Sequence, residues 1–310
     1  MMEHENKNRN SNGLLRRIVI AVLLVIMIGS ALSLVNDWRD AAAQRRLEES
    51  LAEAAKQTET EPPETEKETE AETEAPYVSP IDFTPLLETN PDTIGWIRVP
   101  DTKIDYPIVQ SPDNQYYLHK DFEGNDSVYG AIYLDADSKP DFSGWNNPIY
   151  GHHMKDGSMF KDVVKFKDQD FFEAHRYFEI YTPERTIHLK TLGCYYSDSN
   201  GIVRKTSFKS QASFDKWVSE RLAPCSFAEV PEQPFDSMFM LVTCSYEQND
   251  ARTLLFAAEV DEDGNFLPAT GRNVPEIGAE VTATTDAKTS AEANAKPAAA
   301  TDAKPNTKEK

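Results

Sequence analysis

The sequence contains little cysteine: three of its 310 residues, Cys194, Cys225 and Cys244. An odd number of thiols excludes a fully paired disulfide framework, so at least one thiol stays free. None of the three stands in a CxxC pair or at the spacing of zinc ligands. The acidic stretch DEDGN at 261–265 is interpreted as a solvated turn rather than a cation site. We therefore predict no metal and no cofactor.

Positive charge is also scarce. The chain has 32 Lys and Arg against 52 Asp and Glu, which gives a net charge of −20. Residues 58–76 carry −7 of this charge and residues 77–270 carry −14, and the second segment has no basic cluster with interleaved aromatic residues. Binding of a nucleic acid needs a basic surface that replaces the counterions of the phosphates. The composition therefore argues against a nucleic-acid partner.

A single long apolar run stands near the N-terminus. The uncharged sequence IVIAVLLVIMIGSALSLV at 18–35 is close to the minimum length for crossing a bilayer core. A signal peptide is the alternative, but its apolar region is usually shorter, and Ala31 offers a poor cleavage site. Basic residues are slightly more numerous before the run than after it. We predict a single-pass protein of the cell membrane, with a cytoplasmic N-terminus at 1–17, a transmembrane anchor at 18–35 and an extracellular domain.

Composition also marks the segments around the folded domain. Residues 36–57 have helix-favouring residues and are predicted to form a stalk helix. Residues 58–79 are rich in Thr and Glu, and such a segment cannot offset the entropy of ordering, so we expect a disordered spacer. Residues 266–310 are rich in Ala, Thr and Lys and are expected to form a disordered tail. One folded domain remains, at 80–265.

Eight short apolar runs bounded by Pro, Gly, Asn or Asp occupy this domain, at 94–99, 104–110, 131–134, 147–151, 177–182, 186–196, 238–244 and 252–260. Such a pattern favours an antiparallel barrel or sandwich. Helical patterns at 158–175 and 211–222 interrupt the runs. The predicted fold class is mainly β with peripheral helices, preceded by one transmembrane helix.

A free thiol raises the question of a nucleophile. Cys194 lies inside an apolar run and Cys225 follows a helix, so both are interpreted as buried structural residues. Cys244 ends the run MFMLVTC and precedes a polar loop, a common position for catalytic groups. If the last two runs form a hairpin, Arg252 faces Cys244 and supplies a cation to a thiolate or an oxyanion. The alternative, which the spacing supports equally, is that Arg252 lies at the edge of the sheet and is exposed to solvent.

Acyl transfer from a thiol also needs a proton donor for the leaving amine, usually a histidine. Among the six histidines, His152 and His153 stand where an apolar run ends at Gly151, in NPIYGHHM. Neighbouring residues of an extended segment point to opposite sides, so only one of the two can face a site. His175 and His188 have settings that favour structural roles, His119 is possible but has no special setting, and His4 lies in the polar N-terminal segment.

These motifs resemble those of the sortase family, and specifically class B. The resemblance rests on NPIYGHHMKDGSMF, on LVTC, and on the arginine eight positions after the cysteine, together with the segment from NPDTIGW to AIYLD, and it covers roughly residues 80–262. It implies a closed sortase-like β-barrel. In the family's TLxTC motif, this chain has Met240 in place of the first Thr and Val242 at the variable position.

The resemblance also implies functional residues and partners. It assigns the catalytic roles to Cys244, His152 and Arg252, and the binding of a sorting signal to Asn114, Leu118, Tyr150, Thr243 and Ile202. The implied activity is a cysteine transpeptidase that cleaves the sorting signal of secreted proteins through a thioester and transfers the acyl group to an amine of peptidoglycan or of a pilin. The alternatives are a cell-wall cysteine peptidase and a tethered surface module without activity.

The string LPATG at 267–271 reads like the pentapeptide that other sortase classes cleave. A sorting signal is followed by an apolar span and a basic end, and residues 272–310 contain no such span. We interpret the string as a coincidence. The alternative is that this segment occupies the chain's own groove or is cut by a related enzyme.

Overall fold

The computed structural model describes residues 2–56, 77–197, 204–245 and 251–271, with the side chains of residues 2–14, Cys244 and Ser245 left out. Most of the predicted Thr/Glu spacer, the tail beyond residue 271 and Ile202 lie outside these ranges.

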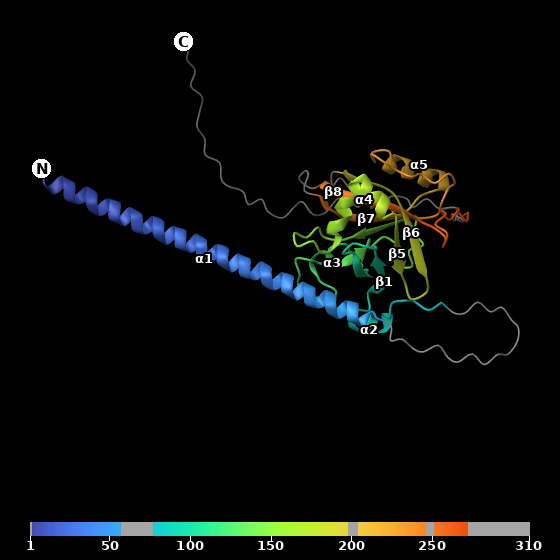
Figure 1. Cartoon of the computed structure of the whole chain (residues 1–310), viewed down its shortest axis with the longest axis horizontal. Helices are drawn as coiled ribbons and strands as arrows, with labels where there is room; N and C mark the ends of the chain where they lie inside the picture. The colour runs from blue at the N-terminus through green and yellow to red at the C-terminus, as the bar shows by residue number, and fades with distance from the viewer. Residues whose placement is uncertain (1, 57–76, 198–203, 246–250, 272–310) are drawn as a thin grey trace, which may run out of the picture. The chain divides into compact units, whose positions relative to one another are not determined.

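Each of the eight apolar runs forms a strand: β1 (Thr93–Arg98), β2 (Asp105–Val109), β3 (Ile132–Leu134), β4 (Asn146–Tyr150), β5 (Tyr177–Tyr181), β6 (Thr186–Ser197), β7 (Met238–Ser245) and β8 (Ala251–Glu259). The strands form a closed barrel, seen beside the long N-terminal helix in Figure 1. Their order around the barrel is β1-β2-β3-β4-β7-β8-β6-β5. This confirms the predicted closed barrel with peripheral helices.

The expectation of purely antiparallel pairing is wrong at two places in the barrel. Strand β2 pairs with β3, and β4 pairs with β7, in parallel. Apolar runs reveal where strands are but not which strands become neighbours, and a parallel pair needs a long crossover connection. The β4–β7 pair has a functional consequence, because parallel strands bring their carboxyl ends to the same edge of the sheet.

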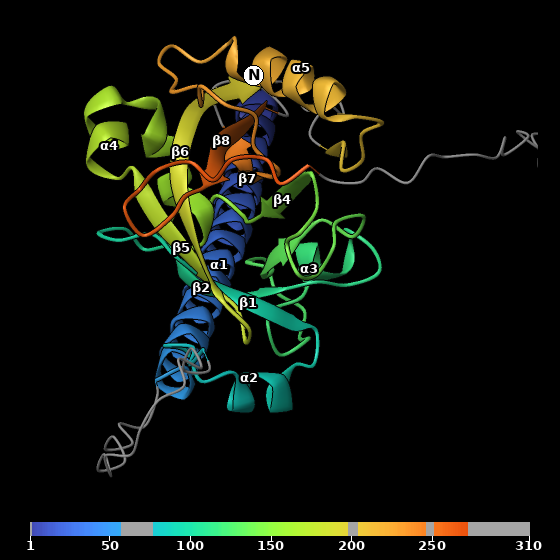
Figure 2. The same cartoon turned by 90° about the vertical axis from the view of Figure 1, so that its right-hand side faces the viewer.

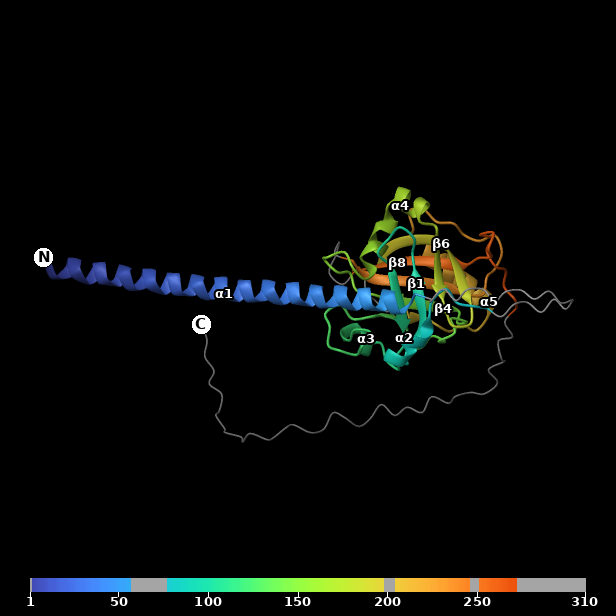
Figure 3. The ribbon, with the colours of Figure 1, turned by 60° about the horizontal axis from the view of Figure 1, so that its bottom comes forward.

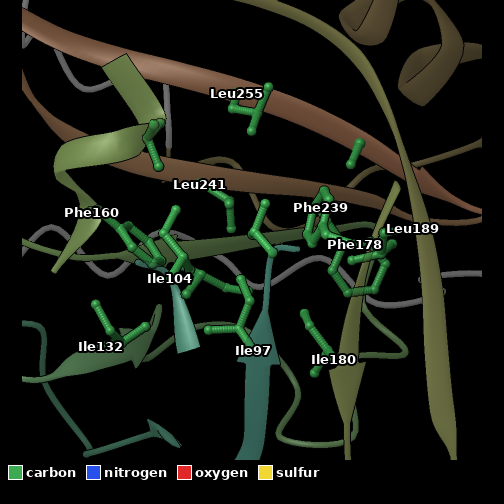
Figure 4. Close-up of a cluster of buried hydrophobic side chains, with 14 of the residues drawn as sticks. Ile97, Ile104, Ile132, Phe160, Phe178, Ile180, Leu189, Phe239, Leu241 and Leu255 are labelled. Carbon is green, nitrogen blue, oxygen red and sulfur yellow. The ribbon is translucent and has the colours of Figure 1, made fainter. Parts of the chain in front are cut away.

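The barrel interior is filled by aliphatic and aromatic side chains from nearly every strand. Ile97, Ile180, Leu189, Leu241 and Leu255 are all almost fully buried in one cluster. Figure 4 shows these side chains converging from different strands, with Phe160 pointing into the same interior. Burial of this much apolar surface is the main stabilising term for the barrel that carries the site.

The first predicted helical pattern, at 158–175, is divided in two. A 3₁₀ helix, η1 (Phe160–Lys167), precedes the short α-helix α4 (Gln169–Ala174). Asp168 separates them, and its carboxylate accepts a hydrogen bond of 3.0 Å from the backbone N–H of Phe171 as the N-cap of α4. A capping residue in the middle of the pattern explains why one continuous helical face does not form.

The second helical pattern is confirmed as α5 (Gln211–Leu222), which packs on the outer side of the barrel (Figure 2). Its buried residues are Phe214, Trp217, Val218 and Leu222, and they contact apolar residues of β6, β7 and β8. Two further short helices, α2 (Phe83–Thr89) and α3 (Tyr116–His119), have no pattern long enough to be seen in the sequence.

The N-terminal apolar run and the predicted stalk form one continuous helix, α1 (Met2–Ala54). It is the one helix of the described residues that is long and apolar enough to cross a membrane. Its C-terminal end contacts α2 and β2, and Leu51 and the following Ala55 are buried beside Phe83 and Leu86 of α2. Figure 3 shows this end of α1 next to α2 and the barrel.

The two ends of the Thr/Glu-rich segment meet. Lys56 forms an antiparallel bridge with Ile81, and the backbone N–H of Asp82 donates to the carbonyl oxygen of Ala55 at 3.1 Å. The chain therefore leaves and re-enters the described structure at one place. The disordered spacer expected at 58–79 stays a prediction.

Residues 266–270, which follow the boundary expected at residue 265, also contact the folded domain. Phe266 bridges Val260, the N–H of Ala269 donates to Pro234, and the N–H and hydroxyl of Thr270 donate to the carboxylate of Asp236. The LPATG string thus lies beside the residues that precede β7. Cys244 is near the opposite end of that strand.

Candidate active site

Three strand ends converge at one edge of the barrel. In the parallel pair, Tyr150 lies opposite Val242, and the N–H of Gly151 donates to the carbonyl oxygen of Val242 at 3.1 Å. In the antiparallel pair, Cys244 is the cross-strand partner of Arg252. The register therefore places the segment that carries His152 beside Thr243 and Cys244, and it places Arg252 opposite Cys244. The predicted hairpin arrangement of Cys244 and Arg252 is present.

A surface cavity of about 250 Å³ lies at this edge. Of the predicted residues, His152, Arg252, Asn114, Leu118, Tyr150 and Thr243 line it together. Ile202 is outside the described residues, and so is the side chain of Cys244. Four other lining side chains, Gln115, Tyr133, Arg204 and Val242, were not among the predicted site residues.

His152 is half-buried and held by the backbone of α3. Its Nε2 atom lies 2.8 Å from the carbonyl oxygen of Leu118. A carbonyl oxygen only accepts, so this hydrogen bond assigns a proton to Nε2. His153 is buried and bridges Met159 instead. One histidine of the pair faces the cavity, as alternation along an extended segment predicts.

Gly151 makes the approach of this segment possible. A Cβ atom at this position would lie 2.5 Å from Cδ1 of Ile132 and 2.6 Å from Cγ of Phe160. Both contacts are far shorter than van der Waals separation, so only glycine allows the chain to pass between these core residues and turn toward the cavity.

Arg252 brings a permanent positive charge to the cavity wall. It is half-buried near the start of β8, and its Nη1 atom donates to the carbonyl oxygen of Ala251 at 3.2 Å. A guanidinium stays protonated at all physiological pH values, so its charge does not depend on neighbouring groups. A cation in this position can stabilise a thiolate or an oxyanion at the adjacent strand end.

The other two cysteines have the properties of structural residues. Burial raises the pKa of the Cys194 thiol far above its usual value, and burial raises the pKa of Cys225 to about 11. Thiols of this kind carry almost no thiolate at neutral pH and are poor nucleophiles. Cys244 is the remaining cysteine, and it stands at the cavity edge by register.

The histidines set aside in the sequence have other contacts. His175 stacks on Phe171 with ring centroids 3.9 Å apart, and Nδ1 of His188 lies 3.1 Å from the carboxylate of Glu179. His119 is exposed and lines a different cleft, beside α1. Asp261 in the DEDGN turn accepts hydrogen bonds from the backbone and side chain of Asn265, which closes the turn on itself.

A buried carboxylate, that of Asp135, stands directly behind the cavity wall. It accepts hydrogen bonds from Asn114, Tyr150 and Arg204, all of which line the cavity. Burial, followed by the negative charge of Asp135, raises the pKa of the Tyr150 hydroxyl, which therefore remains a neutral donor. The sequence signal for Asp135 was weak: it is a polar residue directly after the apolar run AIYL.

Comparison with known proteins agrees with this geometry. The family model of the sortase domain matches residues 97–260. Sortase B of Listeria monocytogenes is 33% identical over 165 residues, which cover 53% of this chain and 67% of the relative. Sortase B of Staphylococcus aureus is 26% identical over 178 residues, which cover 56% of this chain and 73% of the relative.

Among solved structures, the X-ray structure of Clostridium perfringens sortase B aligns with a TM-score of 0.55 and 29% identity, over 58% of this chain and 100% of that chain. The barrel, the strand-end cavity and these matches together define the class, and the chain belongs to the sortase family. Within the family it is a class B sortase, and its activity is that of a cysteine transpeptidase acting on surface proteins.

Proposed function

We propose that Cys244, His152 and Arg252 carry out the transpeptidation, on a sorting signal bound by Asn114, Leu118, Tyr150 and Thr243. The observation that carries this proposal is the strand register, in which β4 and β8 both flank β7 at the end that holds Cys244. Ile202 remains a predicted binding residue on the resemblance alone.

The chemistry begins with the thiolate of Cys244 and the doubly protonated imidazole of His152. The sulfur attacks the carbonyl carbon of the scissile peptide, and the guanidinium of Arg252 stabilises the oxyanion that forms. When the tetrahedral intermediate collapses, the C–N bond breaks and the leaving amine takes the proton from Nδ1 of His152. The products of this half-reaction are a thioester on Cys244 and a neutral imidazole.

The second half-reaction transfers the acyl group to an amine. The acceptor amine attacks the thioester carbon, and Nδ1 of His152 takes the proton that the nitrogen loses. Collapse of the second intermediate breaks the C–S bond and restores the thiolate. An amine of peptidoglycan is the general acceptor of the family, and a pilin lysine is the alternative for this chain.

The cavity suits an extended peptide. The ring of Tyr150 stacks on that of Tyr133, with centroids 5.1 Å apart, and offers an apolar wall. Asn114, Arg204 and the backbone near His152 supply polar groups on the other positions of the wall. A few polar groups in a mostly apolar cleft are the usual means of orienting a ligand.

The apolar part of α1 anchors the enzyme in the cell membrane in this proposal, with residues 1–17 in the cytoplasm and the barrel outside. Its large apolar side chains are exposed, Val25 by 70% and Leu34 by 69%, and no part of the chain that the structure describes covers them. Lipid is the solvent that such a helix requires. The extracellular side is also where secreted substrates meet wall precursors.

The test of the proposal uses a peptide library with quenched fluorophores and one fixed threonine, offered with and without hydroxylamine. We expect the wild-type chain to cleave a subset of peptides, and to yield hydroxamate and faster turnover when hydroxylamine is present. Cys244→Ala should abolish both, whereas the matched control Cys225→Ala should retain them. Turnover by Cys244→Ala would disprove the assignment of the nucleophile.

The same assay separates transpeptidation from the peptidase alternative. A hydrolase would release the carboxylic acid at a high rate even when no amine is present. Formation of hydroxamate in proportion to hydroxylamine is the expected result, because an acyl-enzyme that excludes water must await an amine.

A further inference from the structure

Asp135 follows β3 directly and is hidden behind the wall of the cavity. Its side chain is fully buried, with 0% exposure, and it is not one of the residues that line the cavity. A buried carboxylate is costly unless hydrogen bonds and opposite charge compensate it. The compensation of Asp135 comes mainly from the cavity wall.

One oxygen of Asp135 holds three side chains of that wall. Oδ2 accepts from Nδ2 of Asn114 at 3.1 Å, from the hydroxyl of Tyr150 at 2.8 Å and from Nε of Arg204 at 3.1 Å. The donors come from three separate parts of the chain: the segment before α3, the end of β4, and the segment before α5. The second oxygen, Oδ1, accepts from the backbone N–H of Asp137 at 3.0 Å.

Neighbouring contacts fix the orientation of the same side chains. Oδ1 of Asn114 accepts from the N–H of Ala136 at 2.9 Å, so the amide cannot rotate without losing two hydrogen bonds. Nη2 of Arg204 donates to the exposed carboxylate of Asp137 at 2.8 Å. The hydrogen bond and charge of Asp135 raise the pKa of Arg204, which keeps the guanidinium charged beside it.

We propose that Asp135 is a positioning residue that sets the geometry of the sorting-signal groove through Asn114, Tyr150 and Arg204. The inference rests on the proposed function, because it assigns those three side chains to substrate binding. Asp135 touches no substrate itself. Its loss releases three wall side chains at once, which changes substrate binding more than it changes the chemistry at Cys244.

The decisive variant is Asp135→Asn, which keeps the shape but removes the charge and one acceptor. With the best peptide from the library and saturating hydroxylamine, we expect KM to rise roughly tenfold to 100-fold, as loss of hydrogen bonds to a charged group and misplacement of the substrate predict. We expect kcat to stay within about threefold, because the described hydrogen bonds of Asp135 reach neither His152 nor Arg252.

Asp137→Asn is the matched control. It removes the other carboxylate that pairs with Arg204, but it leaves Asn114 and Tyr150 untouched, and Asp137 is 65% exposed. An exposed ion pair contributes little, so KM should change by less than about twofold. An equal change in KM in both variants would overturn the inference, because it would show that only the ion pairing of Arg204 affects substrate binding.

Two further measurements keep the result interpretable. The rate at which iodoacetamide alkylates Cys244, followed by mass spectrometry of the tryptic peptide, should be the same in Asp135→Asn and wild type, because the nucleophile is not affected. If Asp135→Asn does not fold, Tyr150→Phe removes one of the three donors and keeps the ring, and its KM should rise roughly fivefold.

The outcomes are distinct. An unchanged KM in folded Asp135→Asn, or in Tyr150→Phe, overturns the positioning role while wild-type turnover still supports the proposed function. A fall in kcat with unchanged KM and altered alkylation of Cys244 overturns it as well, because Asp135 would then act on the chemistry. Absence of turnover by the wild-type chain would overturn the proposed function and this inference with it.

Discussion

The imidazole of His152 donates from Nε2 to the carbonyl oxygen of Leu118 at 2.8 Å, which ties the residue that follows β4 and Gly151 to the backbone of α3. In the proposed mechanism, this contact leaves Nδ1 as the nitrogen that transfers the proton. Because a carbonyl oxygen cannot donate, the ring keeps Nε2–H in both protonation states, and only Nδ1 changes.

The first prediction separates this contact from proton transfer. His152→Gln retains an N–H that can donate to Leu118 but has no group that transfers a proton. We expect kcat/KM to fall by about 10² to 10⁴ with little change in thermal unfolding. His119→Gln, one residue from Leu118 and exposed, is the control and should retain wild-type activity. Full activity of His152→Gln would remove His152 from the mechanism.

The second prediction concerns thiol reactivity. The pKa of Cys225 is raised to about 11, so about 0.1% of that thiol is ionised at pH 8, and Cys194 is buried more deeply. Iodoacetamide at pH 8 should therefore modify Cys244 before either of the others. Peptide mapping of a time course gives the three rates. Faster labelling of Cys194 than of Cys244 would contradict the assignment of the nucleophile.

The third prediction concerns the pH dependence of stability. Burial alone would raise the pKa of Glu229, but hydrogen bonds from Lys190 and Arg176 outweigh it and lower the pKa below 4.5. A lowered pKa in the folded state means that the stabilisation is complete above pH 4.5 and is lost as the pH falls through the folded-state value. The carboxylate is 37% exposed, so solvent screening limits this contribution.

We therefore expect Glu229→Gln to reduce the free energy of unfolding by about 1 kcal/mol at pH 7 and by much less near pH 3. Urea unfolding at both pH values measures the difference. Glu220→Gln is the matched control, since Glu220 lies 4.0 Å from Lys216 on an exposed helix face and should have no effect at either pH. A constant effect of Glu229→Gln across this range would contradict the ionic origin of the stabilisation.

The fourth prediction tests the contact between α1 and the barrel. Leu51 is 9% exposed, and Leu51→Ala should cost about 2 kcal/mol, which lowers the melting temperature of the detergent-solubilised full chain by about 4 to 8 °C. Leu87→Ala is the matched control, because Leu87 lies on α2 and is 39% exposed. This substitution should change the melting temperature by less than about 2 °C. Equal effects of the two variants would show that α1 does not pack stably.

Features of the fold that depend on a local residue pattern could be predicted from the sequence. The runs that become β7 and β8 were visible because apolar residues gather there, and the polar loop between them indicated a hairpin with Cys244 opposite Arg252. The apolar spacing of Phe214, Trp217, Val218 and Leu222 gave α5 for the same reason. The roles of Cys244, His152 and Arg252 together came from the family resemblance.

Strand pairing and contacts between residues far apart in the chain could not be predicted from the sequence. No pattern in β4 reveals that it pairs in parallel with β7, because the two strands are far apart in the chain and pairing depends on the whole barrel. Asp135 looks like an ordinary turn residue until the fold brings Asn114, Tyr150 and Arg204 around it. The capping role of Asp168 likewise overrode an apolar period that suggested one helix.

The bridge between Lys56 and Ile81 bears on where the enzyme can work. On the proposed topology, the length of α1 alone determines the distance between bilayer and barrel. At about 1.5 Å per residue, this distance is roughly 24 Å from Val35 to Leu51. The Thr/Glu-rich segment can be lengthened, shortened or nicked by a protease without changing that reach. The barrel then stays at a constant distance from the membrane, and the enzyme acts only on substrates that reach that distance.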